Sequence, residues 1–316
     1  MPHHSLPAAP LTFERACAQV LDHLQRTVPL GYWAITRFDG ERQVYLQVRD
    51  TAYGTAPGGS HPWEDSLCRR MVEGAPRVAP DVAAVPGYAD APVTRAFPIG
   101  AYVGVPLQDV DGGLFGTVCG LDPSARGAEL EQHRPLVELL AALLTGLLRA
   151  ERGERRTAEL TRWALEGSAG RPLSRIANRR GWFDFLAEAD AHHRAHGDPA
   201  RVVVFALGDG DRVPGRPTPA AHERLVRRAA DLLRREVREH DFVADLGGGQ
   251  LGLVLTRVAP AVAELTVRRV HRALLAGGFR AACGSAQYSL AEGFAAAWAR
   301  AEAAALLDAA VVPGAA

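Results

Sequence analysis

Apolar and polar positions along the first 128 residues follow two different periods. Some stretches place apolar residues at helical spacing, while others alternate apolar and polar residues as half-buried strands do. The turns Asp39-Gly40 and Asp111-Gly112-Gly113 join two of the strand pairs. The pattern predicts an α+β domain over residues 11–128, with helices at 13–27 and 63–72 and strands at 32–38, 43–48, 101–107 and 114–121.

Residues 129–170 have a different pattern, with a wide apolar stripe followed by a charged stretch. Leu136, Leu139, Leu140, Leu143 and Leu147 form the stripe. It predicts one long linker helix, or two helices broken near Gly153, between two domains. Such a stripe has to be buried, either against the first domain or against a parallel helix of a second chain. We expect both, and therefore a homodimer through the linker helix and the first domain.

The second half of the chain alternates between helical and strand-like segments. This order predicts a central sheet surrounded by helices in a domain over residues 171–312. The stretch DLGGGQLGLVL, residues 245–255, reads as a hairpin around three glycines. Helices are expected at 181–196, 220–240, 260–276 and 290–309, strands at 201–207 and 279–286, and a flexible N-terminus at 1–10.

Composition and charge exclude several classes of function. The formal net charge is zero, which argues against a nucleic-acid partner or an anionic membrane recruited by bulk charge. All 36 basic residues are Arg, so chemistry that needs a lysine amine is excluded. The four Cys are scattered and no run of 18 apolar residues occurs, so we expect a cytoplasmic protein without structural zinc or a membrane span.

Several blocks of the second half resemble a GGDEF domain, the diguanylate cyclase fold. Residues 173–180, LSRIANRR, are similar to the first motif of that family, L-T-G-L-x-N-R-R. Residues 229–255 follow the family pattern through the helix and hairpin without a gap, and Ala301-Glu302 begins a block similar to the late A-D motif. The resemblance covers about 140 residues.

The resemblance implies that the catalytic chemistry has been lost. Joining two GTP molecules needs divalent metal ions, which prefer carboxylate ligands. The positions of the metal and signature acids are Ala206, Gly208, Gly249 and Gln250. Pro214 replaces a guanine-contacting Asn, while Glu223 keeps an acid and a residual nucleotide contact. We expect no catalytic residue and no metal. Asp209 and Asp211 would replace the lost ligands only after a register slip, and a solvated turn is the other interpretation of them.

One binding motif of the family is kept. Arg238-Glu239-His240-Asp241 matches the R-x-x-D site, which the resemblance implies to be a site for cyclic di-GMP. A guanidinium suits phosphate oxygens and the guanine edge. The alternative is that Arg238 and Asp241 simply end an exposed helix and begin a strand.

The first half resembles a GAF domain, in the blocks 63–68, 76–81, 99–107 and 112–122. The resemblance implies an antiparallel sheet with flanking helices that cups a small molecule, but it names neither a ligand nor a cofactor. The N-K-F-D-E motif of cyclic-nucleotide GAF domains is absent. Cys68 and Cys119 could sense oxidants or hold a ligand, or they could serve as small apolar packing residues. The pocket candidates are Trp63, Cys68, Phe97, Tyr102 and Cys119, with Tyr88 as a further residue of a pocket or of the core. His61 could bind haem or metal, or could be an exposed loop residue.

These expectations combine into a cytoplasmic, dimeric signalling protein. A GAF domain senses a stimulus, the linker helix transmits it, and a catalytically inactive GGDEF domain acts as a binding or interaction module for a ligand or a protein partner. Two alternatives remain open. One is an effector that binds cyclic di-GMP through Arg238 and Asp241, and the other is a weak cyclase or GTP-binding protein.

Overall fold

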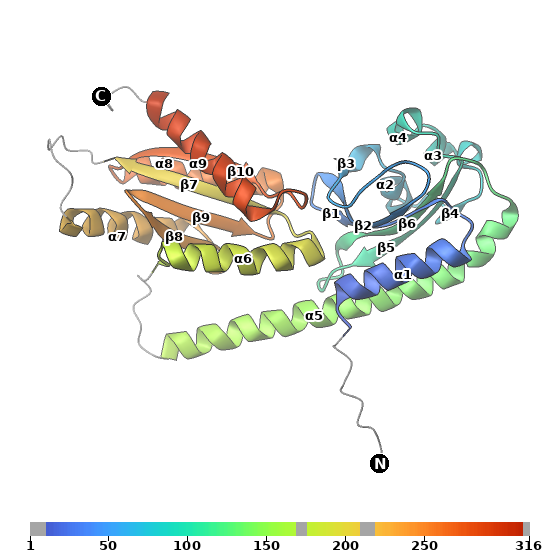
Figure 1. Ribbon diagram of the computed structural model, residues 1–316, viewed down its shortest axis with the longest axis horizontal. Coiled ribbons are helices and arrows are strands. Elements are labelled where there is room, and N and C mark those ends of the chain that lie inside the picture. Colours follow the sequence, from blue (N-terminus) through green and yellow to red (C-terminus); the bar gives the residue numbers. More distant parts are fainter. Residues whose placement is uncertain (1–10, 169–175, 209–218, 312–316) are drawn as a thin grey trace, which may run out of the picture. The chain divides into compact units, whose positions relative to one another are not determined.

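The computed structural model describes residues 11–168, 176–208 and 219–311, without the side chains of 155–168, 219–222 and 310–311. The chain separates into two compact units, Met1–Ala169 and Gly170–Ala316 (Figure 1). Each unit has an antiparallel sheet with helices packed against it, so the α+β prediction is confirmed. The predicted flexible N-terminus lies outside the described residues.

Within residues 11–168, six strands form one antiparallel sheet in the order β3-β2-β1-β6-β5-β4. The central pairing joins β1 to β6, which are far apart in the sequence, with Ala34 opposite Cys119. The hairpins β1–β2 and β5–β6 are the two that the Asp-Gly turns predict. The strands are β1 (Tyr32–Phe38), β2 (Arg42–Asp50), β3 (Ser60–Pro62), β4 (Val78–Ala79), β5 (Ala101–Gln108) and β6 (Leu114–Asp122).

Helices cover both faces of this sheet. Because side chains alternate along a strand, Tyr32 and Ala34 face one side and Trp33 and Ile35 the other. Tyr32 and Ala34 pack with the short helices between β3 and β5, while α1 and α5 lie side by side on the opposite face (Figure 1). The helices are α1 (Phe13–Thr27), η1 (Trp63–Asp65), α2 (Leu67–Val72), η2 (Val82–Ala84), α3 (Pro86–Ala89), α4 (Pro92–Ala96), η3 (Ala128–His133) and α5 (Arg134–Ser168).

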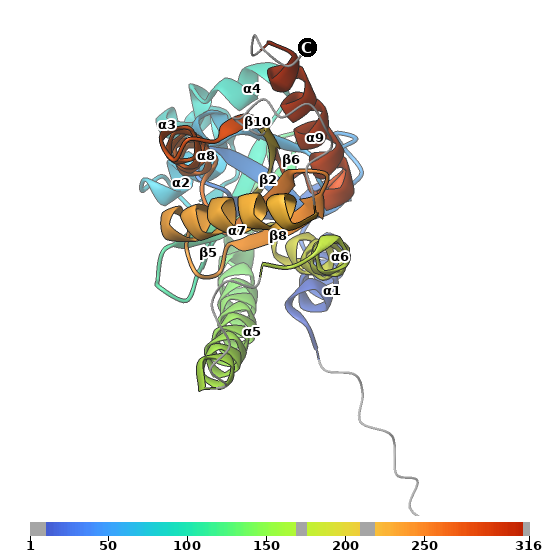
Figure 2. The same cartoon turned by 90° about the vertical axis from the view of Figure 1, so that its left-hand side faces the viewer.

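The linker segment is one helix. Helix α5 runs from Arg134 to Ser168 without a break at Gly153, as Figures 1 and 2 show. Val137, Ala141, Leu144 and Leu148 are buried on its inner face, and α5 contacts β5 and α1. None of the five predicted stripe leucines is itself buried: Leu136, Leu140 and Leu147 are half-buried and Leu139 and Leu143 are exposed. The helix therefore packs on the sheet of the N-terminal unit with the face one residue further on than the stripe that the sequence predicts.

In the second unit, four strands form an antiparallel sheet in the order β10-β7-β9-β8. Alternate residues of the central strand β7 enter two separate cores: Val203 and Phe205 pack with α7 and α8, while Val202 and Val204 pack with α6 and α9. The elements are α6 (Arg179–His196), β7 (Ala200–Gly208), α7 (Pro219–Glu236), β8 (Phe242–Gly247), β9 (Gln250–Thr256), α8 (Pro260–Ala276), β10 (Arg280–Gln287) and α9 (Gly293–Val311).

Four predicted helices have different bounds in the structure, and two of these differences have a clear physical cause. The helix expected over 63–72 is interrupted at Ser66, whose extended backbone and side-chain oxygen cap the N-terminus of α2. The helix expected over 220–240 ends at Glu236, because the Asp241 carboxylate accepts a hydrogen bond from the backbone N–H of Arg238 and fixes a turn. Among the described residues, no helix is long and apolar enough to cross a membrane.

Candidate functional site

The N-terminal unit contains a cavity of about 500 Å³ beside its sheet. Its wall combines strand residues with the segment that leads into β3 and with α4. The surface is mostly apolar and aromatic, and a few polar groups converge on it, which is the usual composition of a small-molecule site. The lining residues include Tyr32, Tyr45, Tyr53, Ser60, His61, Asp65, Val93, Phe97, Ile99 and Leu121.

Three tyrosines and a histidine supply the polar groups of the cavity. The Tyr45 hydroxyl lies 2.9 Å from Nδ1 of His61, and the rings of Tyr32 and Tyr45 pack edge to face. Burial and the nearby Arg42 lower the pKa of His61, so its imidazole is neutral at pH 7. Burial raises the pKa of Tyr32, Tyr45 and Tyr53, which therefore keep their protons. These four side chains thus offer neutral hydrogen-bonding groups to a ligand, and Asp65 adds a carboxyl group to the lining.

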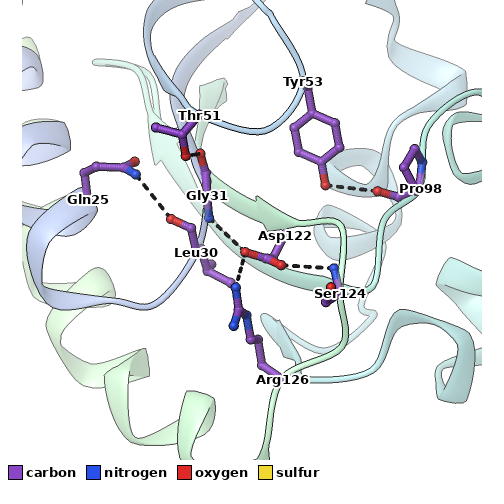
Figure 3. Close-up of polar contacts among 9 residues, drawn as sticks. All are labelled: Gln25, Leu30, Gly31, Thr51, Tyr53, Pro98, Asp122, Ser124 and Arg126. Carbon is purple, nitrogen blue, oxygen red and sulfur yellow. Dashed lines mark hydrogen bonds and ion pairs between the residues drawn. The ribbon is translucent and has the colours of Figure 1, made fainter.

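The rim of the cavity is tied down by hydrogen bonds (Figure 3). The Tyr53 hydroxyl donates to the backbone oxygen of Pro98 at 3.1 Å, and its ring packs edge to face on Phe97. The Asp50 carboxylate accepts backbone hydrogen bonds from Ala52, Tyr53 and Thr55. The loop after β2 is therefore held in one arrangement over the cavity.

Of the five predicted pocket residues, the structure places Phe97 on the cavity wall. Trp63, Cys68, Tyr102 and Cys119 belong to the buried core cluster that also contains the wall residue Tyr32. Tyr88 lies in that cluster as well, whereas His61 lines the cavity. Sequence reasoning missed Tyr32, Tyr45 and Tyr53; the available signal was that three of the six tyrosines of the chain fall between residues 32 and 53.

In the C-terminal unit, the β8–β9 hairpin and the end of β7 bring the four predicted lost-acid positions together. Ala206 pairs with Gln250 across β7 and β9, and the backbone N–H of Leu207 donates to the oxygen of Gly249 at 2.8 Å. Gly208 ends β7 one residue further on. None of these four residues carries a carboxylate, and the described residues contain no cluster of three His, Cys, Asp or Glu that could hold a metal.

The other residues that the GGDEF resemblance singles out near the active site do not join these four positions in the part of the chain that the structure describes. Glu223 is an exposed residue of α7, where its carboxylate forms an ion pair with Arg227 at 2.8 Å. Asp209, Asp211 and Pro214 lie outside the described residues.

Arg238 and Asp241 border a small cavity of about 140 Å³. Asp241 is buried, and its carboxylate accepts backbone hydrogen bonds from Arg238 at 2.9 Å and Thr256 at 3.5 Å. Burial raises the pKa of this carboxyl, although these hydrogen bonds and His240 oppose the shift. Arg238 is exposed, and Arg269 on the same cavity pairs with Glu236 at 3.2 Å.

Comparison with known families identifies the N-terminal unit. Residues 12–147 match the family described as "GAF domain". This segment is a GAF domain. The match includes the first part of α5, so the inner face of that helix belongs to the GAF domain. No curated protein matches the chain.

Solved structures similar to this chain include GGDEF domains. One is the diguanylate cyclase SiaD of Pseudomonas aeruginosa in complex with its activator SiaC, with 21% identity, a TM-score of 0.40 and coverage of 57% of this chain and 74% of that chain. Another is the GGDEF domain of DgcB from Caulobacter crescentus in complex with c-di-GMP, with 19% identity, a TM-score of 0.40 and coverage of 44% and 89%. A far-red cyanobacteriochrome photoreceptor is also similar, with 17% identity, a TM-score of 0.35 and coverage of 43% and 85%.

Proposed function

We propose that this chain is a signalling protein with a GAF sensory domain and a catalytically inactive GGDEF domain that acts as a binding or interaction module. One observation carries the proposal. Ala206, Gly208, Gly249 and Gln250 meet at one end of the C-terminal sheet, and no carboxylate stands among them. Hard divalent metals need oxygen ligands of that kind to stabilise the charge that develops during phosphoryl transfer.

The backbone of the hairpin supports the same conclusion. Gly249 has φ of +81°, a conformation that L residues rarely adopt, and a Cβ built there would lie 3.0 Å from the backbone oxygen of Leu207. An Asp at this position would be strained as well as crowded. The hairpin is therefore shaped for glycine and not for the acid of the family motif.

The test is an incubation of the purified full chain with GTP and Mg²⁺ or Mn²⁺, with cyclic di-GMP measured by liquid chromatography and mass spectrometry. An active diguanylate cyclase serves as the positive control. We expect no product above the blank without protein. Metal-dependent product that scales with protein concentration would reject the inactive-domain proposal in favour of a weak cyclase.

A second candidate function is an effector that binds cyclic di-GMP near Arg238. The observation that favours it is that the guanidinium-bearing residues Arg238 and Arg269 border one cavity. The volume of about 140 Å³ is small, so a dinucleotide would bind across the surface and not inside. Because the Asp241 carboxylate already accepts two backbone hydrogen bonds, Arg238 is the residue expected to contact the ligand.

Calorimetry separates this candidate from the first one. Cyclic di-GMP is titrated into the wild type, into Arg238→Ala and into Arg234→Ala, a matched change at another exposed Arg of the same helix region. The effector proposal expects binding heat with the wild type and Arg234→Ala and its loss with Arg238→Ala. If the wild type gives no binding heat, the effector function is rejected. If all three proteins give equal binding heat, cyclic di-GMP binds at a site other than Arg238.

Signal transmission is assigned to α5 in a homodimer. The inner face of α5 packs on the GAF domain, while Leu139 and Leu143 on another face are 58% and 62% exposed. A ligand that binds one packing arrangement of paired helices more tightly shifts the population toward it. With no catalytic output, the C-terminal domain would act through a bound nucleotide or a protein partner. The four free cysteines fit a reducing cytoplasm.

A further inference from the structure

A row of buried polar side chains crosses the sheet of the GAF domain and ends at the sulfur of Cys68. Gln43 on β2, Thr36 on β1 and Thr117 on β6 are each at most 2% exposed. Nε2 of Gln43 lies 3.2 Å from Oγ1 of Thr36, which lies 2.8 Å from Oγ1 of Thr117. Cys68, at the start of α2, packs over the row. Buried polar groups are costly unless they are paired, so the row needs an acceptor at its end.

The hydrogen-bond directions in this row all lead toward Cys68. Oγ1 of Thr36 accepts from Nε2 of Gln43 and from the backbone N–H of Thr117, both at 3.2 Å. Its own hydrogen therefore points to Thr117, through the backbone oxygen at 3.4 Å or the hydroxyl at 2.8 Å. The Thr117 hydroxyl is then left to donate to Sγ of Cys68 at 3.2 Å.

Two more donors reach the same sulfur. Nε2 of Gln43 lies 3.2 Å from Sγ of Cys68, and the Tyr102 hydroxyl lies 3.5 Å from it. A neutral thiol sulfur is only a weak acceptor, whereas a thiolate accepts strongly. Three convergent donors around one buried sulfur are thus an arrangement that favours the anionic form.

Cys119 is the second thiol of the site, because it lies two residues after Thr117 on the same face of β6 and packs in the same core cluster as Cys68. Burial alone would raise the pKa of Cys68, but hydrogen bonds from Cys119, Thr117, Tyr102 and Gln43 outweigh it and lower this pKa. The hydrogen bond to Cys68, burial and the charge on Cys68 raise the pKa of Cys119 instead. The pair therefore combines a Cys68 thiol whose pKa is lowered to about 7 with a Cys119 thiol that keeps its proton at pH 7.

We propose that Cys68 and Cys119 form a peroxide-reactive dithiol site inside the GAF domain, with Cys68 as the nucleophile and Cys119 as the resolving thiol. Hydroperoxides select cysteines by their thiolate character and their accessibility, and the donors around Cys68 supply the first of these. The inference goes beyond the proposed function, because it names a chemical stimulus, and it is independent of what the C-terminal domain binds.

The two-step reaction balances with a hydroperoxide as the only co-reactant. The Cys68 thiolate attacks one peroxide oxygen, the O–O bond breaks, and Cys68 becomes a sulfenic acid while the leaving oxygen takes a proton. The Cys119 sulfur then attacks the Cys68 sulfur, and its proton leaves with the sulfenic hydroxyl as water. With hydrogen peroxide, two thiols lose two electrons in total and two waters form.

The 500 Å³ cavity is the nearest described hollow from which a small oxidant could approach the pair, which is otherwise buried. The wall residue Tyr32 shares a core cluster with both cysteines. Burial, Cys119, Tyr45 and Cys68 raise its pKa, so the Tyr32 hydroxyl keeps its proton. Hydrogen peroxide is nearly as small as water, so its entry requires only local motion of the side chains between the cavity and the pair.

The other two cysteines of the chain are matched controls. Burial and the carboxylates of Glu151 and Glu14 raise the pKa of Cys17. Burial together with Asp308 and Glu264 raises that of Cys283 to about 12. Both are therefore protonated thiols at pH 7, in the same chain and under the same conditions.

The experiment treats the reduced full chain with limiting hydrogen peroxide at pH 7, stops the reaction by alkylation in denaturant, and maps the peptides by mass spectrometry. We expect a Cys68–Cys119 disulfide that forms about tenfold or more faster than Cys17 or Cys283 is oxidised, because each unit of pKa changes the thiolate fraction about tenfold. In Cys119→Ser, Cys68 is expected to become a sulfenic acid that dimedone traps. In Cys68→Ser, Cys119 stays reduced.

A conservative pair of variants tests the role of the donors. Thr117→Val keeps the shape of the side chain and removes its hydroxyl, and the oxidation of Cys68 is expected to slow about tenfold; Thr117→Ser restores it. Circular dichroism checks that each variant is folded. Oxidation of Cys68 no faster than that of Cys17 and Cys283, or oxidation of Cys119 unchanged in Cys68→Ser, would overturn the proposal. Where a cysteine variant does not fold, the wild-type peptide map and the Thr117 pair decide.

Discussion

Asp122 shows how one residue can hold several segments of the GAF domain together (Figure 3). Its side chain is buried, and its two oxygens accept from the backbone N–H groups of Gly31 and Ser124, each at 3.0 Å, and from Arg126. Burial opposes ionisation, but the hydrogen bonds from Arg126, Ser124 and Gly31 lower the pKa of this carboxyl. The ionised carboxylate thus joins the end of β6 to the segment before β1.

Asp122→Asn is expected to destabilise the GAF domain by about 1–3 kcal/mol, because one amide cannot accept from all three donors. The sign of the pH effect follows from the lowered pKa. The stabilisation by Asp122 is fully present above the unfolded pKa of about 3.9 and is lost as the pH falls through the lower folded pKa. The difference in the free energy of unfolding between wild type and Asp122→Asn, measured with urea at pH 7 and below pH 4, should therefore be smaller in acid.

The matched control is Asp111→Asn, which changes an exposed carboxylate in the β5–β6 turn and should unfold as the wild type does at both values of pH. A difference between Asp122→Asn and wild type that stayed constant down to pH 2 would show that the carboxylate does not stabilise the fold through its charge.

The positions of single side chains are what the sequence predicts least well in this protein. The hairpin positions could be assigned because a gapless motif fixes each residue to a place on a strand, and Ala206 does pair with Gln250. The cavity wall could not be assigned in this way. Tyr53 reaches it from a loop through its hydrogen bond to Pro98, a contact between residues 45 positions apart that no local period encodes.

At the scale of elements, hydrophobic period located the longer strands and the long helices of both units, because their buried faces repeat over many residues. It did not locate the short edge strands β3 and β4, which have three and two residues. It failed at 63–72, where the apolar residues keep helical spacing across a break. Ser66 makes that break with two hydrogen bonds: its hydroxyl donates to the backbone oxygen of Trp63 at 2.8 Å and accepts from the N–H of Arg69 at 3.0 Å. A single capping residue therefore interrupts a helix that the apolar spacing over residues 63–72 predicts to be continuous.

Ser66→Ala removes that cap and is expected to destabilise the GAF domain by about 1 kcal/mol, with the larger part from the lost N-cap. Since α2 carries Cys68, the variant should also loosen the position of this sulfur. Hydrogen exchange followed by mass spectrometry of the peptide around Cys68 measures the local effect, and urea unfolding the global one.

Thr12→Ala is the control for this change, because Thr12 caps α1 in the same way but lies far from Cys68 in the sequence and at an exposed site. If Thr12→Ala increased the hydrogen-exchange rate around Cys68 as much as Ser66→Ala does, the increase would report general destabilisation and not the loss of the α2 cap.

At the scale of the whole molecule, α5 connects the two units and has more apolar surface than one GAF domain covers. Positions 139, 143, 146, 150 and 153 follow heptad spacing along one face and are Leu, Leu, Gly, Ala and Gly. The first two are more than half exposed, and a Cβ at Gly146 or Gly153 would meet nothing within 4 Å. The same spacing continues in the sequence to Thr157, Leu160 and Ala164. We propose that a second copy, related by a two-fold axis and presenting the identical face, covers it.

Leu139→Glu together with Leu143→Glu is expected to convert a dimer of about twice 33.8 kDa into a monomer, measured by sedimentation or light scattering over a range of concentrations. Two like charges on each helix would face two more across the axis, and they would also remove the apolar contact. The monomer should keep its fold, because both leucines lie outside the GAF core and the inner face of α5 is unchanged. Leu265→Glu, at a leucine of α8 that is 64% exposed, should remain dimeric. If the double variant has the same mass as the wild type at every concentration, α5 does not hold the dimer, and a signal from the GAF domain would have to travel to the C-terminal domain within one chain.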